Sequence, residues 1–353
     1  MEKLLMTPGP TNVPERVLNK MNEKMIHHRT SEYSNLFREF NERLKFVFQT
    51  SNNVLTFPSA GTGALEASIA NCFSTGDRIL AVSIGDFGDR FIQIAKIYGL
   101  TVDEIKVPWG KAVSLEEIKN NLKDYHKGLI ITHNETSTGA VNPIKEIGEY
   151  LKDKNILYIV DAVSSLGGID IRMDEWNIDV LVTASQKALM SPPGLSFVGV
   201  SKKAFEYCEI SNIPKFYFDF LNANKFLEKA DPQNPYTPAV SLISAANEAL
   251  AMIEEEGLNN VFLRHKMLAD KFREEIKGMG LNIFTDENAL SNTITAISFE
   301  NANDIKNRLE KEYNIIVAGG QGAAKGKMIR VGHMGCINEE MIYRTLNAIR
   351  EII

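Results

Sequence analysis

Residues 156–165 have the sequence Ile-Leu-Tyr-Ile-Val-Asp-Ala-Val-Ser-Ser, and this stretch indicates the fold most clearly. Its first five residues are apolar, which predicts a strand buried on both faces, as in a parallel sheet covered by helices. The strand ends at Asp161, whose carboxylate is costly to bury unless a cation or a proton donor pairs with it. A turn or a helix cap would also place an aspartate there, so the other strands have to support a functional interpretation.

The same pattern recurs along the first two thirds of the chain, where short runs rich in Val and Ile alternate with segments of helical periodicity. We predict strands at residues 54–57, 78–82, 101–107, 129–132, 156–160, 180–183 and 197–200, and helices at residues 65–73, 91–98, 115–122 and 144–151. Apolar strands separated by helices predict an α/β fold with a mostly parallel sheet covered on both sides.

The last third of the chain has a different pattern. A helical stretch at residues 241–277 precedes strand-like residues 294–299 and 329–331, with helices at 305–312 and from residue 339. This mixture predicts a smaller α+β domain. We therefore divide the chain into an extended N-terminal segment at 1–20, a large domain at 21–240 and a small C-terminal domain at 241–353, and we predict that residues 211–238 form an irregular connection.

Composition excludes several classes of protein. The 353 residues have a net charge of −6 and contain 44% hydrophobic residues, which is ordinary for a globular protein and unusual for a nucleic-acid binder. No run of 18 apolar residues exists, so no membrane span is predicted. The three cysteines form no CxxC pair and the six histidines form no helical pair, so no metal is expected. Without a leader sequence, these cysteines predict reduced thiols and a cytoplasmic location.

Polar residues follow several predicted strands, and in α/β sheets the carboxyl ends of the strands meet at one edge. Residues 58–64, Pro-Ser-Ala-Gly-Thr-Gly-Ala, lead into a helix and could cradle a phosphate or form a plain tight turn. Phe87, which lies between Gly85 and Gly88, could stack on a ligand ring or pack in the core. Residues 133–139 bring hydroxyl and amide groups to the same edge.

Two cationic residues complete this pattern. Lys187 follows the predicted strand at 180–183, where burial would lower its pKa and make it a nucleophilic amine, although a solvated surface lysine is the alternative. Arg330 lies within an apolar strand and could bind a carboxylate through two parallel hydrogen bonds or form a structural ion pair. A phosphate cradle, a stacking ring, Asp161, Lys187 and Arg330 together predict pyridoxal phosphate, which needs a lysine and an anion at its ring nitrogen.

The chain resembles the class V pyridoxal-phosphate aminotransferases, specifically the alanine–glyoxylate/serine–pyruvate branch. The motifs that carry the resemblance extend over most of the chain and are Thr7-Pro8-Gly9-Pro10-Thr11, His28-Arg29 with Glu32-Tyr33, Gly61-Thr62-Gly63, His133-x-Glu135-Thr136-Ser137-Thr138-Gly139, Asp161-Ala162-Val163-Ser164-Ser165, and Ser185-Gln186-Lys187-Ala188-Leu189 with Pro192-Pro193-Gly194. The resemblance implies fold type I of the pyridoxal-phosphate-dependent transferases, with a seven-stranded sheet in the large domain and pyridoxal 5'-phosphate as the cofactor.

The resemblance also implies roles for single residues. Lys187 would bind the cofactor covalently and then move a proton as general acid and base, and Asp161 would keep the ring nitrogen protonated. Arg330 and Gly9 would bind the substrate. The other implied cofactor-binding residues are Gly61, Thr62, Gly63, Ala64 and Gln186 near the phosphate, Thr136 at the ring hydroxyl, Phe87 on the ring face, and Tyr236 and Thr237, which the second subunit of a homodimer would contribute at the subunit interface.

The implied reaction is transamination between a small amino acid, alanine or serine, and a 2-oxo acid, glyoxylate or pyruvate. The same chemistry with aspartate, ureidoglycine or an aminophosphonate as the donor stays open. A cysteine desulfurase is a further alternative because residues 330–336 resemble that family's cysteine loop, although there the substrate-binding arginine follows the cysteine. A binding protein without turnover is a third alternative, which the presence of Lys187, Asp161 and Arg330 together argues against.

Overall fold

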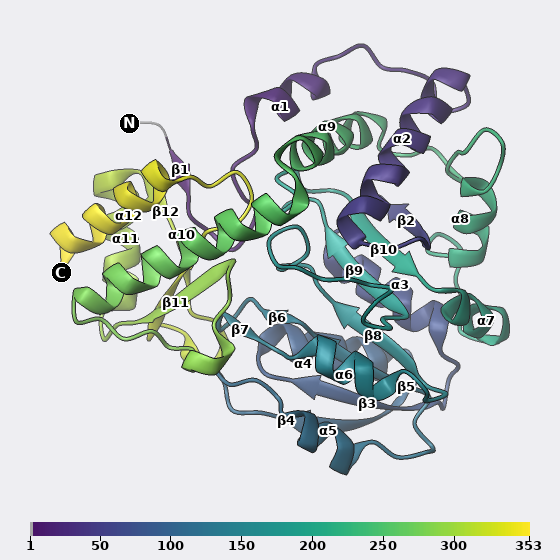
Figure 1. The fold of residues 1–353 in the computed structure, drawn as a ribbon, viewed down its shortest axis with the longest axis horizontal. Helices are drawn as coiled ribbons and strands as arrows, with labels where there is room; N and C mark the ends of the chain where they lie inside the picture. The colour runs from purple at the N-terminus through teal and green to yellow at the C-terminus, as the bar shows by residue number, and fades with distance from the viewer. Residues whose placement is uncertain (1–2) are drawn as a thin grey trace.

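A seven-stranded sheet forms the centre of the larger part of the molecule (Figure 1), and the computed structural model describes residues 3–353. The strands follow the order β2 (Asn53–Phe57), β10 (Ser196–Val200), β9 (Val180–Ala184), β8 (Leu157–Asp161), β5 (Gly128–Thr132), β3 (Arg78–Ser83) and β4 (Thr101–Lys106). Only β10 runs against its neighbours β2 and β9. The prediction of an α/β fold with a mostly parallel sheet is therefore confirmed.

Helices cover both faces of this sheet, and a hydrophobic core lies on each side. One core contains residues of α2 (Ser31–Phe48), α5 (Leu115–Asn121), α6 (Ile144–Leu151) and α9 (Val240–Glu256), and the other contains residues of α3 (Gly61–Cys72), α4 (Asp86–Ile97), α7 (Lys202–Ile210) and α8 (Phe220–Leu227). Leu129 and Ile131 of β5 enter the first core, whereas Ile130 enters the second, because successive residues of a strand face opposite ways. Since each buried aliphatic side chain contributes about 1.5–3 kcal/mol, cover on both faces explains the continuous apolar runs.

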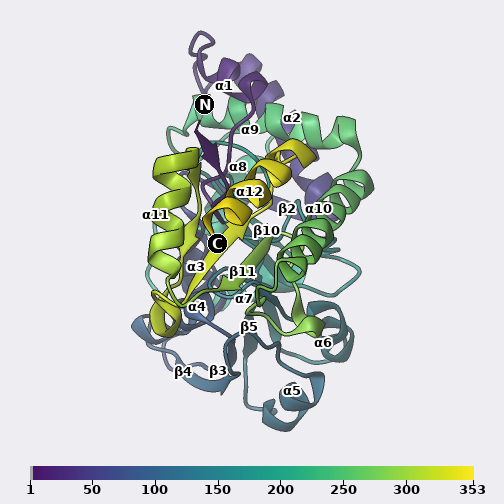
Figure 2. The ribbon, with the colours of Figure 1, turned by 90° about the vertical axis from the view of Figure 1, so that its left-hand side faces the viewer.

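The smaller part is built on a three-stranded antiparallel sheet with the order β11 (Ile294–Ser298), β14 (Met328–Gly332) and β13 (Ala318–Gly319). Figure 2 looks onto this part, where α10 (Leu258–Gly278), α11 (Ala302–Tyr313) and α12 (Glu339–Ile352) pack on one face of the sheet and share a core with Ile329 and Val331 of β14. The N-terminal strand β1 (Leu4–Leu5) also belongs to the smaller part, where it pairs in parallel with β12 (Ile315–Ile316) in a separate two-stranded sheet. The remaining short elements are β6 (Asn134–Glu135), β7 (Ala140–Val141), η1 (Glu287–Ala289) and η2 (Gly322–Ala324).

Three local expectations need correction. The helical stretch at 241–277 forms two helices, α9 and α10, because Gly257 between them has a φ of 82°, which a glycine adopts without strain. The N-terminal segment is not extended throughout, since α1 (Glu15–Met21) buries Val17 against α9. The connection at 211–238 is not wholly irregular, since it includes α8.

The division into domains depends on which core each helix joins. Ile243 and Leu250 of α9 belong to a core of the large sheet, whereas the core of the smaller part includes Leu268 and Phe272 of α10. We therefore propose that the chain passes from one part to the other within α10 rather than at residue 241.

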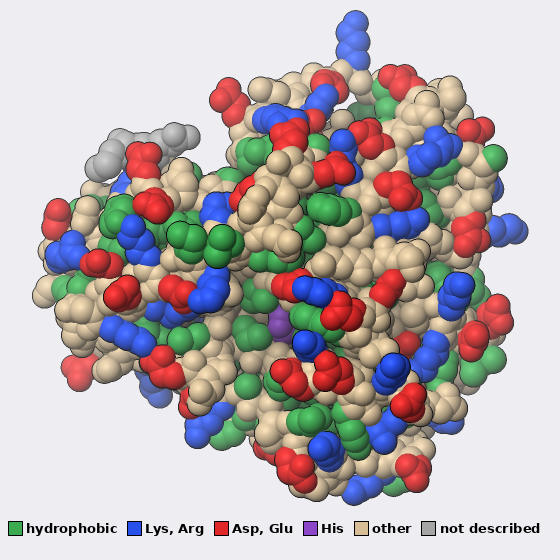
Figure 3. Space-filling model, viewed as in Figure 1, with side chains coloured by type: hydrophobic (Ala, Val, Ile, Leu, Met, Phe, Trp, Pro, Cys, Tyr) green, Lys and Arg blue, Asp and Glu red, His purple; other side chains and the backbone are tan. Residues whose placement is uncertain are grey.

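The surface and the helices agree with the composition. Acidic and basic side chains are interspersed on the face that Figure 3 shows, rather than gathered by sign. No helix formed by residues 3–353 combines the length and the apolar composition that a membrane crossing requires.

Candidate active site

The predicted site residues gather at one edge of the seven-stranded sheet. Strands β2, β3, β5, β8 and β9 run in the same direction, so the segments that follow them begin at this edge. Asp161 ends β8 and lies opposite Thr132 of β5 on one side and Val182 of β9 on the other. This register puts Asp161 in the middle of the edge, with Lys187 on the segment after β9.

Lys187 is buried, with 8% of its surface exposed, and its Nζ donates a hydrogen bond to the carbonyl oxygen of Pro8 (2.5 Å). Burial lowers the pKa of Lys187 to about 8, although the charge of Asp161 opposes this shift. Gly9 closes over this side chain: a Cβ built at Gly9 would lie 2.5 Å from the Lys187 Cδ and 2.7 Å from Nζ. The φ of Gly9, 117°, favours glycine at this position. A substantial fraction of the buried amine is neutral near pH 8.

Asp161 is 3% exposed and accepts two hydrogen bonds, from the backbone N–H of Val163 (2.9 Å) and from the Thr132 hydroxyl (3.4 Å). Burial raises the pKa of its carboxyl to about 6, and the positive charge of Lys187 opposes this rise. Asp161 is therefore an ionised hydrogen-bond acceptor at neutral pH. Because its carboxylate is buried, a cationic or proton-donating partner would stabilise it.

Helix α3 begins with the glycine-rich segment, and its N-cap residue, Ala60, offers no side-chain oxygen to the first N–H groups. A Cβ at Gly61 would lie 2.6 Å from the Val163 side chain, so the start of the helix packs directly against the Asp161 loop. The amide oxygen of Gln186, beside Lys187, is buried without a hydrogen-bond partner. A buried amide without a partner is available to a bound ligand, as the expected role of Gln186 at the phosphate requires.

Phe87 lies in the first turn of α4 and is partly buried. The guanidinium carbon of Arg90 is 4.9 Å from the centre of the Phe87 ring, and Arg90 Nη1 donates to the Thr62 hydroxyl (3.4 Å). Sequence reasoning missed Arg90, although its position three residues after Phe87 on a helix puts both on one face. Arg90 thus connects the expected ring-stacking residue to the expected phosphate cradle.

Arg330 reaches the site from β14 of the smaller part and is 5% exposed. Its Nε donates to the carbonyl oxygen of Gly319 (2.9 Å), and its Nη1 donates to that of Thr136 (2.9 Å). Burial lowers the pKa of Arg330, while the charges of Glu135 and Asp86 raise it. The two backbone bonds fix the plane of the guanidinium, as the binding of a carboxylate requires.

Tyr236 and Thr237 differ from the other predicted residues. The Tyr236 hydroxyl shares its one proton between the carbonyl oxygens of Phe216 (2.7 Å) and Tyr217 (2.6 Å), and its ring stacks on that of Tyr217 with the centres 4.8 Å apart. Thr237 is exposed and lines a surface pocket together with residues 25–28. Within one chain, therefore, the contacts of Tyr236 and Thr237 are not with the residues expected to bind the phosphate.

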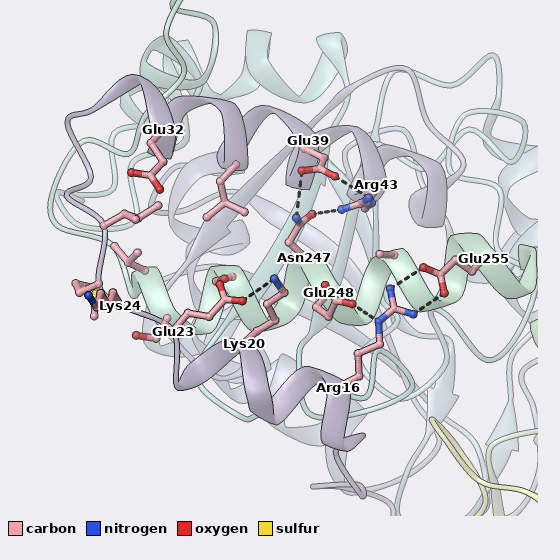
Figure 4. A pocket seen from close by; sticks show the side chains of 17 residues that line it. Arg16, Lys20, Glu23, Lys24, Glu32, Glu39, Arg43, Asn247, Glu248 and Glu255 are labelled. Carbon is pink, nitrogen blue, oxygen red and sulfur yellow. Dashed lines mark hydrogen bonds and ion pairs between the residues drawn. The ribbon is translucent and has the colours of Figure 1, made fainter.

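Another pocket, of about 390 Å³, lies between α1, α2 and α9 (Figure 4), and none of the predicted site residues lines it. Most of its charged side chains pair with one another: Arg16 with Glu248 and Glu255, and Lys20 with Glu23 (2.7 Å). These pairs satisfy most of the pocket's charge, and none of the groups that pyridoxal phosphate needs lines it. Among the residues described, no cluster of three or more His, Cys, Asp or Glu side chains could hold a metal ion.

The residues at the sheet edge fit pyridoxal phosphate. Lys187 would bind its aldehyde carbon, Asp161 its ring nitrogen, Phe87 its ring face, and the start of α3 with Gln186 its phosphate. When bound, this group supplies an aldehyde that combines with amines and a ring that accepts electrons from the bond being broken.

The fold and this set of side chains define an enzyme of fold type I that uses pyridoxal phosphate. The model of the family aminotransferase class-V matches residues 4–342, so the chain belongs to the class V aminotransferases. Serine–glyoxylate aminotransferase of Arabidopsis thaliana is 36% identical to it over 99% of this chain and 90% of its own length. L-aspartate–glyoxylate aminotransferase of Paracoccus denitrificans is also 36% identical, over 96% of this chain and 87% of its own.

The same relationship holds for the three-dimensional structure. The crystal structure of alanine–glyoxylate aminotransferase from Nostoc sp. matches with a TM-score of 0.95 at 33% identity, covering 100% of this chain and 95% of that one. The predicted family, its branch and its cofactor are therefore confirmed.

Proposed function

We propose that this aminotransferase transfers the amino group of a small amino acid, serine or alanine, to glyoxylate, with pyruvate as a second acceptor. The observation that carries this proposal is the meeting of Lys187, Asp161 and Arg330 at one edge of the sheet. The names of the relatives in Arabidopsis and Nostoc support glyoxylate as the acceptor.

In this proposal each residue has one task. Arg330 binds the α-carboxylate of the donor and later that of the oxo acid, which orients the Cα–H bond. Lys187, with a pKa of about 8, takes the proton from Cα and returns it on the other side of the reaction as general base and acid. Asp161 holds the proton on the ring nitrogen. Burial of all three groups keeps water from competing for the moving proton.

Aspartate is a second candidate donor, and Arg90 is the observation that favours it. Aspartate has a second carboxylate, which needs a second cation to bind it. Arg90 lies close to the site, since its charge helps to lower the pKa of Lys187. The relative in Paracoccus uses L-aspartate according to its name. We rank it second because Arg90 already contacts Phe87 and Thr62.

Cysteine desulfurase chemistry has less support. Burial raises the pKa of the Cys336 thiol, which donates a hydrogen bond to the carbonyl oxygen of Asn12 (3.3 Å). A nucleophilic cysteine needs the opposite, a lowered pKa and free access.

We further propose a homodimer in which Tyr236 and Thr237 contribute to the phosphate site of the partner subunit. Arg29 supports this arrangement because it donates to the carbonyl oxygens of Asn234 (2.8 Å) and Pro235 (3.1 Å) and so fixes the chain just before Tyr236. Met25, 68% exposed, is an apolar residue beside Thr237 that a second subunit would cover. The three free cysteines fit the proposed cytoplasmic location.

A donor-by-acceptor screen of the purified enzyme with pyridoxal phosphate tests the proposal. We expect glycine to form from glyoxylate with serine or alanine as the donor. Turnover with aspartate but with neither serine nor alanine would establish the second candidate instead. Sulfide release from cysteine that is lost in Cys336→Ala, without amino transfer, would overturn both.

A further inference from the structure

Glu135 is a buried carboxylate to which the mechanism above gives no task. It ends the short strand β6, just after β5, and none of its surface is exposed (0%). A buried charge needs several hydrogen bonds to offset the loss of water. Glu135 Oε1 accepts from the Ser137 backbone N–H (3.0 Å), the Ser137 hydroxyl (2.6 Å) and the Phe87 backbone N–H (3.3 Å), and Oε2 accepts from the Gly88 backbone N–H (3.1 Å).

These bonds make Glu135 the cap of a helix to which it does not belong. Helix α4 begins at Asp86, and its own N-cap residue is Gly85, which has no side chain to offer. The N–H of Asp86 donates to the Ser137 hydroxyl (3.1 Å), and those of Phe87 and Gly88 donate to Glu135. The first three N–H groups of α4 are therefore all taken by residues 135 and 137.

The close fit around Gly85 shows how tightly the two segments pack. A Cβ built at Gly85 would lie 2.4 Å from the Ser137 hydroxyl oxygen and 2.6 Å from the Glu135 side chain. A side chain at position 85 would displace the Ser137 hydroxyl and the Glu135 carboxylate, so the glycine allows α4 to lie this close to its cap.

Residues 135–137 also contact Arg330, the residue that would bind the substrate carboxylate. Thr136, between the two capping residues, accepts the hydrogen bond from Arg330 Nη1 (2.9 Å). Glu135 is close enough for its charge to raise the pKa of Arg330 and that of Asp161. One short segment thus contacts the ring-stacking residue on α4 and the arginine on β14.

We propose that Glu135 is a positioning residue of the transamination site, whose carboxylate fixes Phe87 against the cofactor ring and Thr136 against Arg330. This inference rests on the proposed roles of Phe87 and Arg330. In this inference Glu135 positions other residues and transfers no proton itself.

The test is Glu135→Gln, which keeps the shape but places an N–H₂ group or a neutral oxygen opposite the Phe87 and Gly88 donors. Three readouts are compared with the wild type: the Kd of pyridoxal phosphate for the apoenzyme, the visible circular dichroism of the bound cofactor, and KM and kcat for the amino donor. Because hydrogen bonds to a charged group are being weakened, we expect the Kd and the donor KM each to rise about tenfold, with a changed dichroism.

Asp179→Asn is the matched control. Asp179 is also buried and accepts from a backbone N–H, that of Tyr158 (2.9 Å), and from a serine hydroxyl, that of Ser201 (3.0 Å), but it also pairs with Lys203 (3.1 Å) and lies at the opposite end of β9. This variant should lower the melting temperature and leave the cofactor Kd and dichroism unchanged.

If Glu135→Gln behaves like this control, Glu135 only stabilises the fold and the inference is wrong. If Glu135→Gln does not fold, Ser137→Ala decides, since it keeps the carboxylate and loosens the same cap: unchanged cofactor Kd and dichroism there would overturn the inference. The cofactor readouts do not depend on the identity of the substrates, so failure of the proposed donors leaves this test intact.

Discussion

Arg330→Lys separates binding of the substrate carboxylate from the rest of the chemistry. In the structure the guanidinium is fixed by two backbone carbonyl oxygens, those of Gly319 and Thr136, both at 2.9 Å. Lysine keeps the positive charge but has a single ammonium group, so it cannot hold both carbonyls and also form two parallel bonds to a carboxylate. The variant therefore loses at least one charged hydrogen bond to the substrate.

The structure suggests the size of this loss. A hydrogen bond to a charged group contributes about 1.5–3 kcal/mol, which corresponds to about 10- to 150-fold in kcat/KM. Because Arg330 would bind the donor and the acceptor in turn, the loss should occur for both substrates and mainly in KM. The Kd of pyridoxal phosphate should stay the same.

The assay is steady-state kinetics with the amino donor and the oxo acid varied separately. Arg273→Lys is a suitable control, because Arg273 is also 5% exposed and donates to Ser291 and Asp270 within the smaller part. Should kcat/KM for both substrates in Arg330→Lys equal that of the Arg273→Lys control, Arg330 would not be the carboxylate-binding residue.

Three further predictions follow from the same site and from the buried histidines. Lys187→Ala should still bind pyridoxal phosphate, seen by absorbance, but lose kcat by about 10⁴-fold or more, because the nucleophile and the proton carrier disappear together. Asp161→Asn should lower kcat by about 10²- to 10³-fold in stopped-flow and steady-state assays, since the anion at the ring nitrogen is lost. Burial lowers the pKa of His133, His265 and His333 to about 3, 4 and 3, respectively. Below pH 6.5 the unfolded chain binds protons at these histidines that the folded protein does not bind, which lowers the free energy of unfolding by up to about 1.4 kcal/mol per pH unit for each histidine between pH 6.5 and 4. The raised pKa of Asp161, about 6, acts in the opposite direction below pH 6, so the net fall measured by urea denaturation should be smaller in the wild type than in Asp161→Asn.

Each of these predictions has a contrary result. Transamination that survives nearly intact in Lys187→Ala would remove that residue from the mechanism. Wild-type kcat in Asp161→Asn would mean that its carboxylate does not act on the ring. Constant stability of Asp161→Asn from pH 6.5 to 4 would indicate that the three histidines are protonated in the folded protein, since this variant lacks the opposing carboxyl group.

Local sequence patterns determined much of the fold and part of the site. The apolar runs that became β5, β8 and β9 had to be strands covered on both faces, because exposure of either face would leave apolar area in water. Asp161 and Lys187 could be found because each directly follows such a run, and the end of a strand is a local property.

Contacts between distant segments could not be read in this way. Arg330 and Thr136 are 194 positions apart, and Lys187 and Pro8 are 179 apart, yet each pair is joined by a hydrogen bond. The task that we infer for Glu135 depends on the same kind of contact, since its partners lie on α4, 47 and 48 positions earlier.

The sequence by itself determined the strands of the large sheet, most of the helices between them, and the arrival of Asp161 and Lys187 at the active edge, because burial and periodicity act over a few residues. Only the tertiary structure decided the break between α9 and α10, the arrival of Arg330 from the smaller part, and the capping of α4 by Glu135. These features depend on how whole surfaces fit together, and steric fit between segments far apart in the chain leaves no periodic pattern in the sequence.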